Sequence, residues 1–285
     1  MLTLRHILLP LDFSAAGTAA IPYVRTLANR FHAKVTLLSV VPPAWVSPPG
    51  IVGPPAVPDP GDLQESLQAH LDKLALDGFE STPARVTALG DPAEKILEFT
   101  RDNAVDLVMI PTHGHGLFRR LLIGSVTSKV LHDALCPVWT AAHAEKQHSH
   151  ESPRKVLCAL DGTEKSIALA RWAADFSRQA GATLQFLHVV RPISDWLSLE
   201  SEQTLQEELR AESRSRIGTL LASSGLDFPL RIAMGEIVPT ITEQATEECA
   251  DVIVLGRGAI HETLGRLRTH AHGIIHRSPC PVLSV

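Results

Sequence analysis

The segment from Pro111 to Thr127 contains the residue types that bind phosphate. Gly114 and Gly124 flank nine other residues, and Gly124-Ser125 opens a run typical of a helix. Glycine lets a backbone approach a ligand closely, and the unpaired N–H groups at a helix N-terminus attract an anion. The hydroxyls of Ser125 and Thr127 add possible donors. The segment therefore predicts an anion site, and phosphate is its natural ligand.

Asp12 is a second candidate, because it directly follows the apolar run Leu8-Leu9-Pro10-Leu11. A carboxylate at the end of a strand can accept hydrogen bonds from a ligand or from the N-terminus of the next helix. The pattern around it has no nucleophile elbow, no Walker lysine and no GxGxxG after the first strand. A dinucleotide-binding dehydrogenase is therefore disfavoured, and the residues do not indicate catalysis.

One order of signals occurs twice along the chain. The matching segments are 8–12 and 157–161, 33–38 and 182–187, 106–110 and 251–255, and the Cys-Pro-Val runs at 136–138 and 280–282. The repeat is far longer than solenoid units of roughly 20–50 residues, so it indicates a duplicated domain. We expect domains at 1–142 and 154–285, joined by an aperiodic linker at 143–153.

Strands and helices are expected to alternate in each half. In the first half, the predicted strands are 5–11, 34–41, 84–89, 105–110 and 137–141. Helices are predicted from Ser14 to about His32, over 61–79, after the Asp91-Pro92 cap, and over 125–134. A proline- and glycine-rich loop fills 42–60. This alternation predicts a parallel sheet, which binds ligands beyond the carboxyl ends of its strands. The segment from Pro111 begins at such an end.

These motifs resemble the ATP-binding branch of the universal stress protein family, which carries Gly, two residues, Gly, nine residues and then Gly-Ser or Gly-Thr. The chain matches at Gly114 and Gly124-Ser125, and has Pro111 in place of the first glycine. The resemblance extends to 7–14, to 37–40 and to the terminal Cys-Pro-Val strands. It implies two tandem Rossmann-like or flavodoxin-like α/β domains, each a five-stranded, mainly parallel sheet with helices on both faces.

The resemblance also assigns site residues in the first domain. Asp12 and the backbone of Val40 would face the adenine and ribose, and the phosphates would be held by Gly114, Gly124, Ser125, Val126 and Thr127. The ligand would be ATP or AMP, with or without Mg²⁺. Proline cannot donate an N–H, so Pro111 is tolerable only where the first glycine merely ends the strand.

The second half departs from this pattern. Ala259 replaces Gly114, and Thr269-His270 replaces Gly124-Ser125, which places an imidazole where a phosphate would lie. Asp161 remains at the position of Asp12. We expect weak or no nucleotide binding in this domain, and a role in packing or regulation.

Composition excludes several classes of protein. The formal net charge of −5 argues against a nucleic-acid partner, and no apolar run approaches the ~20 residues that cross a bilayer. The N-terminus lacks a signal-peptide pattern, and the four cysteines form no close pairs, which favours the cytoplasm. His272 and His276 are spaced to share a metal, but capping or surface roles are expected for these histidines and no metal site is predicted.

The leading hypothesis is a non-enzymatic stress-response protein that binds ATP or AMP and thereby changes the surface offered to an unidentified protein partner. A nucleotide-independent interaction scaffold is the alternative, and a slow ATP hydrolase is a third hypothesis. The apolar final strands at 138–141 and 282–285 imply, by the same resemblance, that the two halves pair as an intrachain pseudo-dimer. Two chains could associate further as a homodimer.

Overall fold

The computed structural model describes residues 2–42, 59–112, 123–141, 152–192, 199–257 and 266–285. Its contacts divide the chain into two compact units. One is formed by Thr3–Trp139, and the other by Ser152–Val285 together with residues 2 and 140–141. Each unit is an α/β domain with a five-stranded, mainly parallel sheet, as the sequence predicts.

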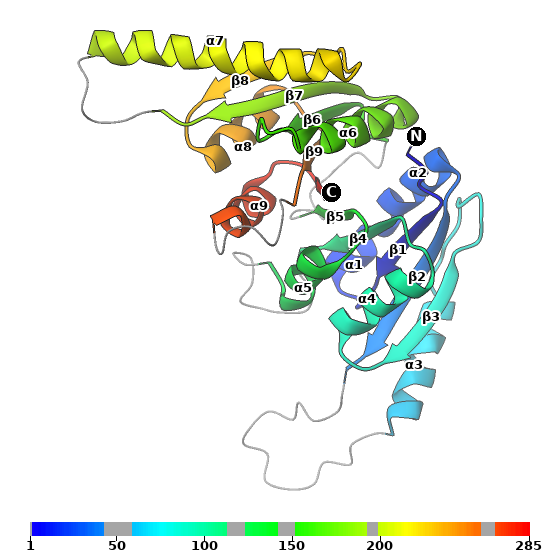
Figure 1. The fold of residues 1–285 in the computed structure, drawn as a ribbon. Helices are drawn as coiled ribbons and strands as arrows, with labels where there is room; N and C mark the ends of the chain where they lie inside the picture. The colour runs from blue at the N-terminus through cyan, green and yellow to red at the C-terminus, as the bar shows by residue number, and fades with distance from the viewer. Residues whose placement is uncertain (1, 43–58, 113–122, 142–151, 193–198, 258–265) are drawn as a thin grey trace, which may run out of the picture. The chain divides into compact units, whose positions relative to one another are not determined.

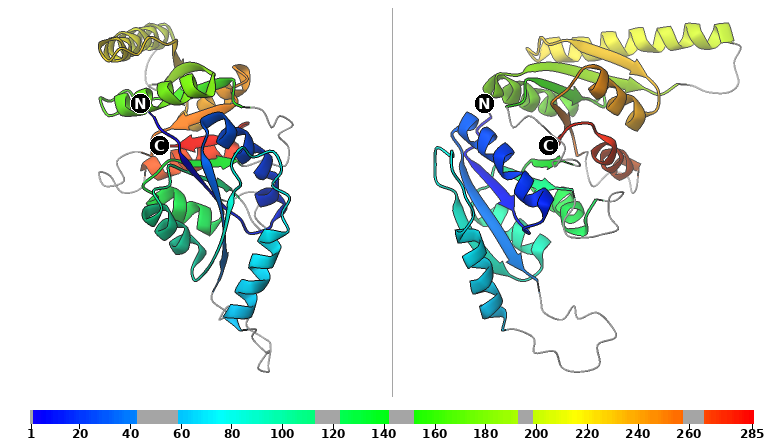
Figure 2. Two further views of the ribbon diagram at one scale, coloured as in Figure 1. Left: turned by 90° about the vertical axis from the view of Figure 1, so that its right-hand side faces the viewer. Right: turned by 180° about the vertical axis from the view of Figure 1, so that it is seen from behind.

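The first domain has the strand order β3-β2-β1-β4-β5. Its strands are β1 (His6–Pro10), β2 (Lys34–Val41), β3 (Ala84–Leu89), β4 (Leu107–Pro111) and β5 (Val138–Ala141). Its helices are α1 (Ala15–Ala19), α2 (Ile21–Phe31), α3 (Pro60–Asp72), α4 (Pro92–Asp102) and α5 (Ser125–Asp133). Figures 1 and 2 show helices on both faces of this sheet.

The second domain repeats this plan with the order β10-β9-β6-β7-β8. Its strands are β6 (Lys155–Ala159), β7 (Thr183–Val190), β8 (Leu230–Met234), β9 (Val252–Leu255) and β10 (Val282–Ser284). Its helices are α6 (Ser166–Ala180), α7 (Leu199–Ser223), α8 (Ile237–Glu247) and α9 (Arg266–Arg277). Helix α8 packs against α9, and α6 contacts α7 (Figure 1).

The central strands are buried along their whole length. Every residue of β1, β4 and β9 is buried, and all strand pairs with a known register are parallel. Continuous apolar runs are typical of strands that helices cover on both faces. This burial explains why the sequence pattern located these strands closely.

Two helices differ from the sequence prediction. The helix expected up to His32 is divided at Ala20, because Pro22 has no N–H for the carbonyl four residues earlier. Helix α3 ends at Asp72, well before residue 79. The guanidinium of Arg85, on β3, donates hydrogen bonds to the carbonyls of Leu71 (2.9 Å) and Leu74 (3.1 Å), and so satisfies the end of this helix.

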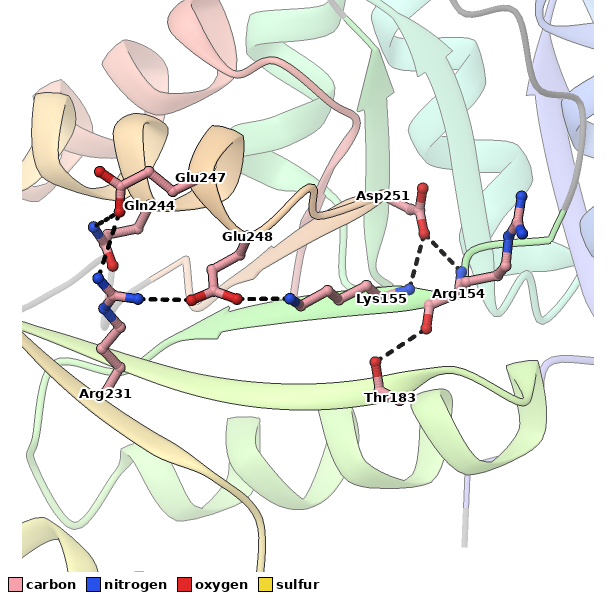
Figure 3. A network of polar contacts seen from close by, with 8 residues as sticks. All are labelled: Arg154, Lys155, Thr183, Arg231, Gln244, Glu247, Glu248 and Asp251. Atoms are coloured by element: carbon pink, nitrogen blue, oxygen red, sulfur yellow. Dashed lines mark hydrogen bonds and ion pairs between the residues drawn. The ribbon is translucent and has the colours of Figure 1, made fainter.

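A polar network joins three elements of the second domain (Figure 3). The carboxylate of Glu248 accepts hydrogen bonds from Lys155 Nζ (2.6 Å) and from Arg231 Nη1 (2.7 Å). The backbone N–H groups of Arg154 and Lys155 donate to Asp251 Oδ2 at 2.8 and 2.9 Å. The network therefore ties β6 and β8 to the segment that connects α8 with β9.

Two further properties concern the described helices and the cysteines. Among the helices in the described ranges, none combines the length and apolar character that crossing a membrane requires. None of the four cysteines, all of which lie in the described ranges, forms a disulfide. Burial raises the pKa of the Cys280 thiol to about 12, so this thiol stays protonated at neutral pH.

Candidate functional site

The candidate site lies at the edge of the first sheet where its strand order reverses. Strand β1 pairs with β2 on one side and with β4 on the other, in parallel, with Ile7 opposite Leu107. The carboxyl ends of β1 and β4 therefore meet at one edge. Asp12 follows β1 and Thr112 follows β4. In open parallel sheets this reversal point is where ligands bind.

Asp12 is exposed, and the next turn of chain holds its carboxylate. Oδ1 accepts hydrogen bonds from the N–H (2.9 Å) and the hydroxyl (2.6 Å) of Ser14. The oxygen of Ser14 in turn accepts from the N–H of Gly17 (3.1 Å) and caps α1. Between them Phe13 has φ 58°, a left-handed conformation that costs about 1–2 kcal/mol for a residue other than glycine. The corresponding residue of the second domain is Gly162.

The start of α5 is fastened to the end of β4. The N–H of Gly124 donates to the carbonyl of Thr112 (2.9 Å), and Thr127 Oγ1 donates to the carbonyl of Pro111 (2.9 Å). Pro111 is thus the last residue of β4, and its carbonyl is used within the fold. Thr127 is 5% exposed and its single hydroxyl proton is committed to this bond. The hydroxyl of Thr127 is therefore used within the fold, and any contact of this residue with a ligand would come from its backbone N–H.

Helix α5 begins differently from α3 and α4. Those two helices are capped by the side chains of Asp59 and Asp91 and carry an acid in the first turn. Helix α5 has Gly124 at its N-cap, no side-chain hydrogen bond there and no acidic residue in its first turn. The first intrahelical bond of α5 runs from the N–H of Ser128 to the carbonyl of Gly124, so the N–H groups of Ser125, Val126 and Thr127 have no acceptor within the helix. They form an end at which an anion would be stabilised.

Of the two remaining predicted residues, the structure describes only Val40. Val40 is half-buried near the carboxyl end of β2, at the same edge of the sheet. Gly114 lies outside the described residues. Ser39, which the sequence did not single out, is buried and donates from Oγ to the carbonyl of Leu11 (2.7 Å). It fixes the backbone before Asp12, and only the pairing of β1 with β2 could have shown this.

The second domain has a comparable turn. Oδ1 of Asp161 accepts from the N–H (2.9 Å) and hydroxyl (2.8 Å) of Thr163, and also from the hydroxyl of Ser166. Burial acts to raise the pKa of Asp161, but the bonds from Ser166 and Thr163 outweigh burial and lower it. The turn that holds the acid is therefore common to both copies.

The two domains differ at the start of the helix that follows the fourth strand. Residues 269 and 270 correspond to Gly124 and Ser125, but α9 begins at Arg266 and so includes both residues beyond its first turn. Their N–H groups are no longer at the start of a helix. Within the described ranges, no group of three His, Cys, Asp or Glu side chains is placed to hold a metal ion.

Comparison with known proteins gives one consistent result. The model of the universal stress protein family matches residues 3–141 and 153–285. A universal stress protein of Mycolicibacterium smegmatis is 28% identical over 195 residues, which cover 66% of this chain and 65% of that protein. The chain thus spans less than two thirds of the length of this relative.

Solved structures agree with the fold. A universal stress protein from Archaeoglobus fulgidus DSM 4304 superimposes with a TM-score of 0.68 at 21% identity, covering 99% of this chain and 96% of that one. A universal stress protein from Archaeoglobus fulgidus in complex with dAMP matches 46% of this chain and 96% of its own, at 20% identity and a TM-score of 0.32. The full-length match shows the two-domain fold.

Proposed function

The chain belongs to the universal stress protein family, and from that premise we propose that its first domain binds an adenine nucleotide, ATP or AMP. The observation that carries the proposal is the start of α5, where no side chain of the described residues caps the N–H groups of Ser125, Val126 and Thr127. It stands at the carboxyl edge of the sheet, because Gly124 is bonded to Thr112 after β4. Uncapped helix N-termini stabilise phosphate groups.

The base and ribose would lie toward β1 and β2. Asp12 is exposed at this edge and Val40 is half-buried beside it, so a carboxylate and a strand-end backbone are available to a nucleoside. Gly114 belongs to the proposal through the sequence motif alone. Pro111 is compatible with the proposal, because it is the last residue of β4 and its carbonyl accepts the hydrogen bond from Thr127. Mg²⁺ would accompany ATP but is not required for AMP.

In this proposal the protein is a non-enzymatic, cytoplasmic regulator of the stress response. Bound nucleotide would change the surface that the first domain offers to a protein partner. The two domains would pair through their final apolar strands as an intrachain pseudo-dimer, and two chains would associate further as a homodimer. A slow ATP hydrolase would need a base, and the carboxylate of Asp12 already accepts two hydrogen bonds from Ser14.

The first experiment is to denature the purified chain and to identify any released nucleotide by chromatography. We expect close to one adenine nucleotide per chain, or one site in a calorimetric titration with Mg-ATP after stripping. Two nucleotides per chain would show that both domains bind. Absence of binding in both measurements would favour a nucleotide-independent scaffold.

A pair of variants at Ser125 locates the site. Ser125 is exposed at the first position of α5, where an acidic side chain stabilises a helix. Ser125→Glu should therefore fold normally but weaken nucleotide binding at least about tenfold through charge repulsion of the phosphates. Ser125→Gln is the neutral control and should bind much more tightly than Ser125→Glu. Equal affinity of the two variants would place the nucleotide elsewhere.

A further inference from the structure

The second domain contains a cavity of about 580 Å³ at the carboxyl edge of its sheet. The ends of β6 and β9 line it, so it occupies the point where the strand order of this domain reverses. Its lining is largely apolar and includes the buried side chains of Leu160, Leu187, Ile241, Leu255 and Ile274. The volume lies within the range of small-molecule sites, roughly 300–1,000 Å³.

One side of the cavity is aromatic. Trp172 lines it and is half-buried, and its indole lies against the fully buried ring of Phe176. The two ring centroids are 5.4 Å apart and the planes differ by 11°. Phe176 thus holds the indole in a fixed orientation. A fixed, flat indole surface favours a planar ligand that can stack on it.

Phosphate recognition at this cavity differs from that in the first domain. The counterparts of Gly124 and Ser125 are Thr269 and His270, which lie inside α9 rather than at its start. Their N–H groups are therefore engaged within the helix. The residue that reaches the cavity from this position is His270, whose imidazole lines it.

His188 adds a second imidazole. It occupies the position of Ser39 and makes the same hydrogen bond: Nδ1 donates to the carbonyl of Leu160 (2.9 Å), as Ser39 Oγ does to Leu11. His188 is 9% exposed and lines the cavity. Because Nδ1 carries the proton, Nε2 of the neutral ring is an acceptor, and it has no hydrogen-bond partner among the described residues.

The tautomer of His270 complements that of His188. The guanidinium of Arg191 lies 3.2 Å from His270 Nε2, and a guanidinium can only donate. Nδ1 of His270 therefore carries the proton and is a donor. The cavity thus combines apolar side chains, a half-buried indole and the imidazoles of His188 and His270, and Asp161, Lys165 and Arg257 also line it.

We propose that this cavity binds a planar aromatic molecule that has an O–H or N–H donor and no phosphate chain. The donor would be accepted by Nε2 of His188, and the ring would lie along Trp172. This inference concerns the second domain alone and does not depend on nucleotide binding by the first. It gives a ligand to the second domain, in which the residues that correspond to Gly124 and Ser125 no longer begin a helix.

The test compares two probes on the full-length chain by calorimetric titration, with Mg-ATP present to occupy any nucleotide site. 2-Naphthol has an aromatic ring and an O–H donor, whereas 2-methoxynaphthalene has the same ring and no donor. We expect one 2-naphthol per chain, bound about tenfold more tightly than the ether, because one hydrogen bond to a buried acceptor distinguishes them. Equal affinities would overturn the role of His188. A 2-naphthol affinity that is much lower with Mg-ATP than in a titration without it would overturn the exclusion of phosphate.

Two variants localise the binding. His188→Ser restores the residue that makes the same backbone bond in the first domain, so it should fold, and it should abolish the preference for 2-naphthol. Ala271→Phe places a ring in the cavity and should abolish binding of both probes. If Ala271→Phe is unstable, Gly256→Val is the substitute, because a Cβ at Gly256 would lie at an ordinary 3.4 Å from Leu169. Unchanged binding in a folded, cavity-filled variant would contradict the proposal.

Discussion

At the scale of single residues, Ser14 links the candidate site to the fold. Its hydroxyl donates to Asp12 at 2.6 Å, and its oxygen accepts from the N–H of Gly17 at 3.1 Å. We expect Ser14→Ala to lower the free energy of unfolding of the first domain by about 1 kcal/mol, because α1 loses its cap. It should also weaken nucleotide binding, since Asp12 loses the hydroxyl, one of the two donors on Ser14 that orient its carboxylate. Urea unfolding and calorimetric titration measure the two effects.

Ser14→Thr is the matched control. Threonine retains the hydroxyl and also caps helices, so both stability and nucleotide affinity should stay close to those of the unsubstituted chain. A Ser14→Ala variant that lost stability but kept full affinity would show that the orientation of Asp12 does not matter to the ligand.

His6 makes the first domain sensitive to pH. It is 3% exposed, and its ring nitrogens contact the carbonyl of Asn103 (3.0 Å) and the hydroxyl of Thr36 (2.9 Å). Burial lowers the pKa of His6 below its ordinary 6.5. The unfolded chain therefore binds this proton first, so the stability that His6 contributes is present above pH 6.5 and is lost as the pH falls through the lowered pKa.

The His6→Gln variant isolates this effect. Glutamine stays neutral, so the decline of unfolding free energy between pH 7 and pH 5 should be shallower than in the unsubstituted chain. The other histidines are the same in both proteins and cancel in the comparison. Identical slopes would mean that His6 is not held neutral by burial.

Single residues also show what the sequence could predict about the site. Asp12 and the cap at Ser14 follow from local order along the chain, and the structure confirms the cap. The hydrogen bonds of Thr127 to Pro111 and of Ser39 to Leu11 join residues distant in sequence. No local pattern encodes such pairs, because they depend on how neighbouring strands and helices meet.

At the scale of helices, one glycine in α7 and one in α9 test how closely each helix is packed against its own neighbours. A Cβ at Gly218, within α7, would meet no atom within 4 Å, whereas one at Gly273, within α9, would lie 3.1 Å from Val238 Cγ2 on α8. Gly218→Ala should raise the free energy of unfolding by about 0.5–1 kcal/mol, because alanine loses less backbone entropy in a helix.

Gly273→Ala should gain less than Gly218→Ala or lose stability, since α8 and α9 must move apart slightly to admit the methyl group. Thermal or urea unfolding of the two variants gives the comparison directly. A stabilisation by Gly273→Ala equal to that of Gly218→Ala would show that the contact between α8 and α9 is loose.

The network of Figure 3 joins β6, β8 and the end of α8 through Glu248. The hydrogen bond from Lys155 is the main cause that lowers the pKa of Glu248, so its contribution to stability is present above pH 4.5 and is lost as the pH falls through the lowered value. Glu248→Gln should cost about 0.5–1 kcal/mol at neutral pH and low salt, and less at high salt.

Glu247→Gln is the neighbouring control for this network. Glu247 is more exposed and lies 3.4 Å from Arg231, so its loss should cost less than the loss of Glu248. Urea unfolding at two salt concentrations separates the variants. Equal costs at both positions would mean that the shorter bonds of Glu248 contribute no additional stability.

The boundaries of strands and helices were predictable where residues close in sequence determine them. The buried strands follow from apolar runs, and α4 starts at the predicted cap of Asp91. The early end of α3 depends on Arg85, which reaches it from β3. The early start of α9 likewise has no counterpart in α5, although the two copies align in sequence. Tertiary contacts decide such boundaries, so the sequence alone could not.

At the scale of the whole chain, the two copies should respond differently to nucleotide. A ligand at 100 times its Kd stabilises the state that binds it by about 2.7 kcal/mol. With ATP, we expect slower amide hydrogen exchange in β4 and α5, and no change in β9 and α9. Mass spectrometry of peptides from both domains gives this result in one experiment. Protection of β9 and α9 would contradict the proposed asymmetry of the two domains.

The duplication itself was evident from the sequence, because the same order of apolar runs, acids and Cys-Pro-Val segments occurs twice. The family match over 3–141 and 153–285 is consistent with that pattern. The cavity of the second domain was not foreseen. It depends on side chains that β6, β7, α6, α8 and α9 bring together, and the loss of the phosphate motif gave no sign of it.

The carbonyl before the acidic turn accepts a hydrogen bond in both domains. That of Leu11 accepts from the hydroxyl of Ser39, and that of Leu160 accepts from the imidazole of His188. After a gene duplication, a position that two chemistries can satisfy is free to diverge without a cost in folding. A single interchangeable hydrogen bond thus lets the two copies carry different side chains at this position, while the backbone before each acid stays tied to the neighbouring strand.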